Sequence, residues 1–311
     1  ASAIACTTPP DRSEPAGTPV EVSLNGDVAS HTLTTDGVLF VFYNASAVSV
    51  SATVPLGGPS AGGTVVMING SGFADLGGVH CRFGAGAAAT VPATVRSSTQ
   101  LACTSPPVPA GGVVQLALTL NDDMAAFVTS SASFDYYAAS VLSVSRVRPV
   151  GGPSAGGTLL NVSGTGFATL GSVFCRFGIA DRISPGTVVS AQLVQCVSPR
   201  IRGPAVLGGV VPPAGQRERV EVSLNGQDYT TSGPWFVAYD QGLVHVSGLV
   251  PHGGPLAGGT RVVVHGSSFV DHNVHCRFGN GAAAVLVRAA LLNASAIACT
   301  TPPDRSEPAG T

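Results

Sequence analysis

The chain has 311 residues, enough for two or three domains. Only 10% of them are charged, all 15 basic residues are Arg, and the net charge is −2, so the sequence offers no basic surface for nucleic acid or an anionic membrane. No apolar run approaches the ~20 residues of a membrane-spanning helix, and a hydrophobic fraction of 44% argues against disorder. We therefore expect a folded protein with no nucleic-acid partner and no membrane contact in this segment.

The chain repeats itself over a long distance. Residues 1–18 read ASAIACTTPPDRSEPAGT, and residues 294–311 read the same. A match of this length does not arise by chance. The chain is therefore interpreted as one period of 293 residues, which is the offset between positions 1 and 294, plus an 18-residue overlap into the next period. The sequence thus predicts a longer, repetitive protein.

A weaker pattern occurs three times within this period. Each unit opens on a glycine-rich octapeptide, GGPSAGGT or GGPLAGGT, and continues with CRFG and a second cysteine. It closes on an alternating segment such as VEVSLNG and a strand rich in aromatic residues. The octapeptides lie at 57–64, 151–158 and 253–260, the CRFG motifs at 81–84, 175–178 and 276–279, the closing segments at 20–26, 114–122 and 220–226, and the aromatic strands at 40–43, 134–137 and 235–239.

These landmarks divide the chain into four parts. Residues 48–139 and 140–242 each hold a whole unit, so we expect two complete domains there. Residues 1–47 contain only the end of a unit and are the C-terminal half of a domain. Residues 243–311 stop after the second cysteine and are an N-terminal half, which an equivalent of residues 19–47 would complete.

Two routes could complete the half-domain 243–311. A continuous polypeptide would supply the missing strands from its next period, whereas separate chains would exchange strands. In the second route, residues 1–18 of one chain and 294–311 of another would compete for one position, because their sequences are identical. The redundancy therefore favours the covalent array.

The closing segment predicts a half-buried β-strand. In residues 220–226 the apolar Val, Val and Leu alternate with Glu, Ser and Asn, which is the period of two of a strand with one face on the core. The Asn-Gly pairs at 225–226 and 25–26 predict tight hairpin turns. No stretch has a helical apolar period, and short strands between Gly/Pro turns are typical of a β-sandwich.

The order of these motifs resembles that of the IPT/TIG domain, which occurs in plexin- and fibrocystin-like ectodomains and in Rel-type transcription factors. The shared residues are the octapeptide, a strand ending in G-x-x-F, V-x-CRFG, a second Cys before S/T-PP, and V-x-V-S-x-N-G. The resemblance covers essentially the whole chain and implies an all-β fold of tandem immunoglobulin-like (E-set) sandwiches. One departure is Pro199-Arg200 in place of the Pro-Pro pair, followed by a long loop to about Arg219.

Seven cysteines fall into three pairs and one remainder. One pair per unit, at spacings of 22, 21 and 23 residues, indicates a disulfide framework and an oxidising compartment. The expected disulfides are Cys81–Cys103, Cys175–Cys196 and Cys276–Cys299. Cys6 corresponds to Cys299, so we expect its partner in the preceding period and no partner within this segment. Zinc is disfavoured because CxxC spacing is absent.

Four sequons of the form Asn-x-Ser predict N-linked glycosylation in a secreted protein. The strand patterns around Asn69 and Asn161 place both asparagines opposite the apolar face, where a glycan can be carried. The other two candidates are Asn44 and Asn293. Lys, the residue that most often protects strand edges, is absent, so glycans or neighbouring copies are expected to cover these surfaces.

The sequence shows no arrangement of catalytic residues. The histidines His272 and His275 form HxxH, but on a strand they would point to opposite faces. The pair Asp122-Asp123 reads as a turn. The octapeptide lacks Lys and precedes a strand, so it is not a phosphate loop, and no G-x-S-x-G elbow occurs. We expect no enzymatic activity, no metal and no cofactor.

The function predicted from these features is structural. The exact long repeat and the sequons favour a subunit of an extracellular glycoprotein fibril, similar to the flagellar hairs or wall filaments of algae. Its expected partners are other copies of itself, N-linked glycans and, as a further option, another filament protein. The alternative is an ectodomain segment of a cell-surface adhesion or receptor protein. Either function places the chain outside the cell or at its surface.

Overall fold

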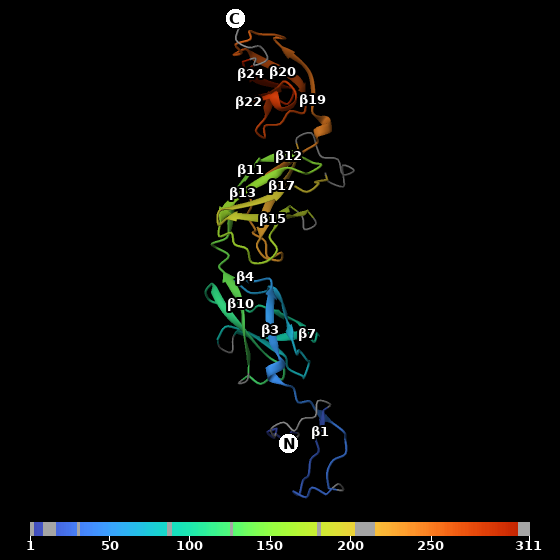
Figure 1. Ribbon diagram of the computed structural model, residues 1–311. Coiled ribbons are helices and arrows are strands. Elements are labelled where there is room, and N and C mark those ends of the chain that lie inside the picture. Colours follow the sequence, from blue (N-terminus) through green and yellow to red (C-terminus); the bar gives the residue numbers. More distant parts are fainter. Residues whose placement is uncertain are drawn as a thin grey trace. The chain divides into compact units, whose positions relative to one another are not determined.

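The computed structural model describes residues 3–8, 17–29, 32–85, 89–124, 127–178, 182–202 and 215–303 (Figure 1). Regular structure in this part of the chain is nearly all β-strand, with the single 3-10 turns η1 (Ala45–Ala47), η4 (Gln241–Leu243) and η5 (Gly281–Ala283). Across the described ranges, no helix combines the length and the apolarity needed to cross a bilayer. The predicted all-β fold class is confirmed.

The chain forms two compact units. The first comprises Ala1–Val54, Val65–Pro107 and Val113–Phe134, and the second comprises Pro55–Thr64, Val108–Gly112 and Asp135–Thr311. The first octapeptide, at 57–64, is therefore part of the second unit.

The first unit contains a ladder of antiparallel strands and a separate small hairpin. In the ladder β3 pairs with β5, β5 with β8, β8 with β7, β7 with β6 and β6 with β9. The hairpin pairs β1 with β2 through Thr18↔Phe40 and Pro19↔Leu39. The strands are β1 (Thr18–Pro19), β2 (Leu39–Phe40), β3 (Ser49–Val54), β5 (Val65–Ser71), β6 (His80–Phe83), β7 (Thr90–Ser97), β8 (Gln100–Thr104), β9 (Gly112–Thr119) and β10 (Val128–Tyr137).

The second unit contains one complete sandwich. Its strands follow the order β11-β13-β16-β15-β14-β17-β18-β12. They are β11 (Ser143–Arg148), β12 (Gly151–Pro153), β13 (Leu159–Thr165), β14 (Phe174–Phe177), β15 (Ile183–Ser190), β16 (Leu193–Val197), β17 (Gln216–Ser223) and β18 (Trp235–Tyr239). Residues 203–214 of the long loop before Arg219 lie outside the described residues.

One strand changes partners and so folds this ladder into two layers. The start of β15 pairs with β14, as in Phe174↔Pro185, whereas its remainder pairs with β16, as in Gly186↔Cys196. Apolar side chains from both layers meet in a core where Leu160, Val162, Phe177, Val220 and Phe236 are fully buried. Complete burial of such side chains contributes roughly 1.5–3 kcal/mol each, so this core accounts for much of the stability of the sandwich.

The glycine-rich octapeptide is a short strand followed by a turn. In 151–158, Gly-Gly-Pro forms β12, which pairs in parallel with β18 through Gly151↔Val237. Gly156 and Gly157 then adopt φ of 86°, a left-handed conformation that other residues rarely take. In the first octapeptide, β4 (Gly57–Pro59) pairs in the same way with the last three residues of β10.

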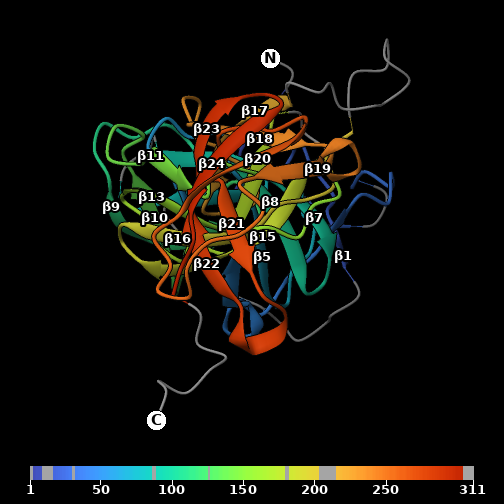
Figure 2. The same ribbon diagram turned by 90° about the horizontal axis from the view of Figure 1, so that it is seen from above.

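The third repeat forms two smaller sheets in the second unit. One has the order β19-β20-β24-β23, and the other contains β21 and β22, which run side by side in Figure 2. Its core is open, since Cys276 and Phe278 are only half-buried. The strands are β19 (His245–Val250), β20 (Arg261–Ser267), β21 (His275–Phe278), β22 (Val285–Arg288), β23 (Ala290–Asn293) and β24 (Ala296–Thr300).

Two expectations about the closing segment were wrong. The polar side chains of β17 do not face solvent, because Glu221, Ser223 and Asn225 are buried like their apolar neighbours. The Asn-Gly pair does not make a two-residue hairpin, because the next bridge after β17 joins Ser223 to Tyr229. Glu221 is covered by Arg176, and the side chain of Asn225 bonds to Gly57 and Asp228.

Candidate binding and assembly surfaces

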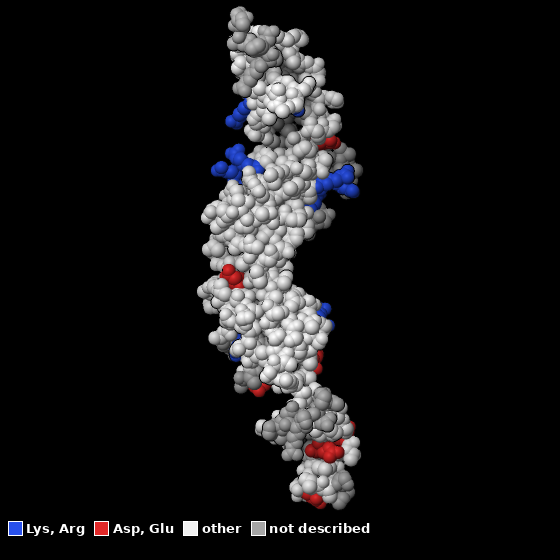
Figure 3. All heavy atoms as spheres, viewed as in Figure 1, with Lys and Arg blue, Asp and Glu red and all other residues white. Residues whose placement is uncertain are grey.

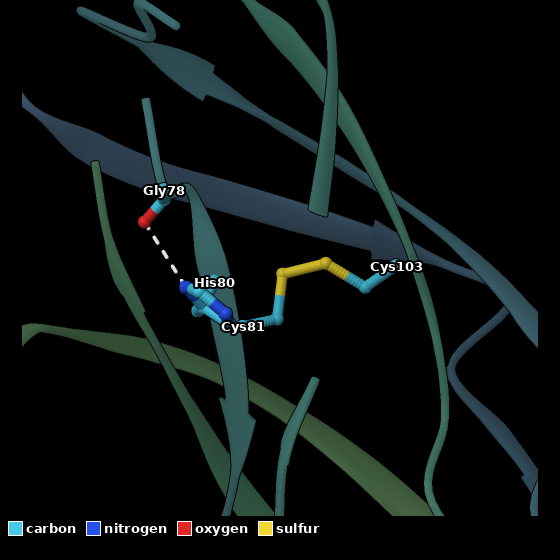
Figure 4. The surroundings of a disulfide bond; sticks show 4 residues. All are labelled: Gly78, His80, Cys81 and Cys103. Atoms are coloured by element: carbon cyan, nitrogen blue, oxygen red, sulfur yellow. Dashed lines mark hydrogen bonds between the residues drawn. A yellow bond between two sulfur atoms is a disulfide. The ribbon is translucent and has the colours of Figure 1, made fainter. Parts of the chain in front are cut away.

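Each repeat contains one disulfide that joins its two layers. The structure pairs Cys81 with Cys103, with Cα atoms 6.4 Å apart (Figure 4). Cys175 pairs with Cys196, and Cys276 with Cys299, at Cα separations of 6.3 Å in both cases. Cys6 is free and exposed. The three pairs are those that the cysteine spacing predicts, and a partner for Cys6 in a preceding period stays a prediction.

The histidines His80, His272 and His275 each have a separate local partner and do not form a metal site. His80 lies beside the first disulfide, where its Nδ1 is 3.0 Å from the carbonyl oxygen of Gly78 (Figure 4). His272 is stacked on Tyr239 with ring centroids 6.4 Å apart, and burial lowers its pKa. The Nδ1 of His275 is instead 2.7 Å from the carbonyl oxygen of Asn273. In the described part of the chain, no three His, Cys, Asp or Glu side chains are grouped as metal ligands.

The four sequon asparagines lie in two settings. Asn69 and Asn161 are on β5 and β13, and each side-chain oxygen accepts a hydrogen bond from a glutamine, Gln100 at 3.2 Å and Gln195 at 2.9 Å. Asn161 is exposed and Asn69 is half-buried. The exposed Asn44 caps the 3-10 turn η1, and the exposed Asn293 is the last residue of β23. Each side-chain oxygen accepts from the backbone N–H two residues on. All four asparagines are therefore at least partly accessible.

A polar cluster that the sequence did not reveal surrounds Asn225 in the second unit. The side-chain NH₂ of Asn225 donates to the carbonyl oxygen of Gly57 at 3.1 Å and to the carboxylate of Asp228 at 2.7 Å. The same carboxylate oxygen accepts from the hydroxyl of Thr64 at 2.7 Å. Gly57 and Thr64 come from the first octapeptide, so within the second unit this cluster ties that octapeptide to the turn at 225–228. The Asn-Gly motif was its only local signal.

A backbone hydrogen bond and the side chain of Tyr137 accompany this cluster. The backbone N–H of Leu56 donates to the carbonyl oxygen of Leu170 at 2.7 Å, and Leu170 is buried. Burial raises the pKa of Tyr137, and the negative charge of Asp228 adds to the rise. Within the second unit, the first octapeptide and the residue before it are therefore held against the second repeat by backbone and side-chain hydrogen bonds.

Arginine provides the few charge contacts of the second repeat. Arg176 on β14 donates through Nε to Glu221 on β17 at 2.9 Å, and its guanidinium lies 4.2 Å from the ring centroid of Tyr229. Arg182 pairs with Glu218. The rest of the surface is sparsely charged, as the face seen in Figure 3 shows.

The chain matches the model of one protein family. The IPT/TIG domain model matches residues 48–136, 142–238 and 245–310, which together make up most of the chain. No curated protein matches it.

Several solved structures match the chain at low sequence identity. The full extracellular region of plexin A4 is 18% identical with a TM-score of 0.46, and the match covers 84% of this chain and 21% of that one, so this chain spans about a fifth of it. The Escherichia coli adhesin FdeC is 13% identical with a TM-score of 0.24, covering 84% and 90% of the two chains. Invasin, a bacterial integrin-binding protein, is 8% identical with a TM-score of 0.22, covering 83% and 54%.

Proposed function

Because the chain belongs to the IPT/TIG domain family, we propose that it is a structural segment of an extracellular fibril built from tandem immunoglobulin-like repeats. The observation that carries this proposal is the exact match of residues 1–18 with residues 294–311. Filaments need equivalent units that join in the same way many times, and an exact 18-residue match at an offset of 293 residues indicates such a repeat.

The disulfides support a location outside the cell or at its surface. Each repeat has one, and in the two complete repeats both cysteines are buried between the layers. Such bonds form and persist in oxidising compartments and are rare in the cytosol. A secreted route would also expose the four sequons to glycosylation.

The proposed role is non-catalytic. The polar clusters of the described residues, those around Asn225 and Arg176, are used to join strands and repeats. The proposed partners are other copies of the chain, N-linked glycans and a further filament protein, with no nucleic acid and no membrane contact within this segment. The scarcity of charge supports contacts between copies, because it leaves little like-charge repulsion between them.

Fractionation of the cells that produce the protein tests this function. Extracellular filaments are sheared off and collected, the remaining membranes are dissolved in detergent, and peptides of residues 142–238 are quantified in both fractions. We expect most of the protein in the sheared filaments. Recovery mainly in the detergent fraction would contradict the fibril and favour the receptor or adhesion ectodomain.

A further inference from the structure

The described residues between 18 and 40, which are 18–29 and 32–40, already form the pairing of the hairpin that closes a sandwich. Thr18↔Phe40 and Pro19↔Leu39 reproduce the pairs Glu218↔Phe236 and Arg219↔Trp235 of β17 and β18. The hydrogen bonds agree as well: the N–H of Val22 donates to the Thr34 hydroxyl at 3.0 Å, as that of Val222 does to the Thr230 hydroxyl at 3.1 Å. The segment is therefore a preformed copy of the closing hairpin of the second repeat.

The apolar face of this hairpin is exposed. Val20 is 44% exposed where Val220 is fully buried, and Leu24 is 91% exposed where Leu224 is fully buried. Phe40 is 38% exposed, whereas the equivalent Phe236 is fully buried and meets Phe177 edge-on at 5.7 Å. An apolar face of this kind gains free energy when a matching surface covers it.

The third repeat has the matching vacancy. In the second repeat β14 lies between β15 and β17, whereas among the described residues β21 has β22 as its one neighbour. Phe278 is half-buried where Phe177 is fully buried. β24 already pairs with β20 and β23. Among the described residues, the third repeat therefore lacks the closing hairpin and the short octapeptide strand that pairs with it in the second repeat.

The register of the second repeat fixes how the two would fit. There β14 and β17 pair through Phe177↔Val220, Arg176↔Glu221 and Cys175↔Val222. Transferred to the third repeat, this register places Val20 opposite Phe278, Glu21 opposite Arg277 and Val22 opposite Cys276.

The transferred register also reproduces the charge contact. Arg176 and Glu221 form an ion pair with side chains only 26% and 10% exposed. Both residues of the corresponding pair, Arg277 and Glu21, are exposed in this chain. The hairpin and the vacancy are thus complementary in backbone, in apolar side chains and in charge.

We propose that the third repeat of one copy of this chain is completed by the hairpin of residues 18–40 from a second copy, which adds to β21 as an antiparallel strand. The inference rests on the proposed function and specifies how its repeats join. In a longer polypeptide the next period would supply the same hairpin. When these 311 residues stand as a free chain, the donor is a second copy, and successive copies join head to tail.

A charge-swap experiment on the full chain tests this proposal by sedimentation velocity over a range of concentrations. In Glu21→Arg the hairpin carries an arginine that faces Arg277, and in Arg277→Glu the hairpin's Glu21 faces a second carboxylate, so each variant repels itself. We expect the unchanged chain to self-associate and each variant to associate at least about thirtyfold more weakly. In a mixture of the two variants, both kinds of junction between unlike copies have opposite charges, so the mixture should associate although each variant alone does not. The double variant tests the same complementarity within one protein.

The double variant carries Glu21→Arg and Arg277→Glu together. Every junction between its copies then has opposite charges again, with the two signs exchanged between hairpin and vacancy. We expect its association to return close to that of the unchanged chain. Recovery of this kind identifies a direct contact between the two positions, which independent effects at either site would not produce.

The control is Arg261→Glu, which reverses an exposed charge on β20 and should leave association unchanged. Circular dichroism and disulfide mapping establish that each variant is folded. A chain that stays monomeric at all concentrations overturns the proposal, as do charge reversals without effect, or a folded double variant that associates no better than either single variant. Any of these results leaves the proposed function intact, because a covalent array can still form filaments.

Discussion

At the residue scale, Asn225 illustrates how a turn residue becomes a structural contact. It is 5% exposed, and its side-chain oxygen also accepts from the backbone N–H groups of Gln227 and Asp228 at 3.0 and 2.9 Å. Asn121 occupies the same position in the first repeat, where it accepts from the Thr119 hydroxyl at 3.0 Å but is exposed. The same local motif therefore serves two environments.

We predict that Asn225→Ala destabilises the second unit by about 2 kcal/mol, because it leaves buried N–H and C=O groups without partners. Asn121→Ala serves as the matched control and should cost less than about 0.5 kcal/mol, because water replaces its contacts. Urea unfolding measures both. Equal losses in the two variants would show that the contact with Gly57 contributes nothing.

Tyr137 makes the stability of the second unit depend on pH. Because burial and Asp228 raise the pKa of Tyr137 in the folded state, the unfolded chain loses this proton first, at about pH 10. The stabilisation is thus complete below about pH 10 and is lost as the pH rises further.

We predict that the melting temperature of the unchanged chain falls more steeply above pH 10 than that of Tyr137→Phe, which has no proton to lose. Thermal unfolding measured at several pH values between 8 and 11 tests this. Part of the decline remains in the variant, because burial also raises the pKa of Tyr229 and Tyr239. Identical declines in the two proteins would exclude Tyr137 as a contributor.

At the scale of elements, the disulfide between β14 and β16 links the two layers of the second sandwich. We predict that replacing Cys175 and Cys196 together by Ala destabilises the second unit by about 3 kcal/mol, since the open loop regains its freedom in the unfolded chain. Cys6→Ala is the control and should change stability little, because Cys6 is free and exposed. Non-reducing peptide mapping should recover the three pairs within repeats. Pairs between repeats would contradict the account.

The strand environment of the sequons leads to a second prediction at this scale. Asn161 is exposed on β13, so native material should carry N-linked glycan there and at Asn69, with Asn44 and Asn293 as further sites. A glycosidase removes the glycans in ¹⁸O-labelled water, and mass spectrometry of the resulting peptides identifies the asparagines that were occupied. Four unmodified asparagines would count against passage through a glycosylating pathway.

Local patterns predicted most elements but not their surroundings. The alternation in β5 and β13 placed Val66, Ile68, Leu160 and Val162 in the core correctly. The burial of Glu221 and the role of Asn225 could not be predicted, because their partners Arg176 and Gly57 lie 45 and 168 residues away. Such contacts depend on which distant residues pack against a strand or turn, and a short local motif contains no information about those residues.

At the scale of the whole molecule, the chain repeats one kind of domain. Three segments match the IPT/TIG domain, two of them complete and one that lacks its closing hairpin. The hairpin of the same design stands at residues 18–40, with its apolar face exposed.

The most direct test of the extracellular fibril is immunogold electron microscopy with an antibody against the second complete repeat, residues 142–238. Intact, unpermeabilised cells of the source organism are labelled, and the same cells are labelled again after sectioning. If the protein forms an extracellular fibril, gold particles will lie along filaments outside intact cells, in rows that follow each filament. Gold confined to the cytoplasm of sectioned cells, with none on the intact surface, would contradict it.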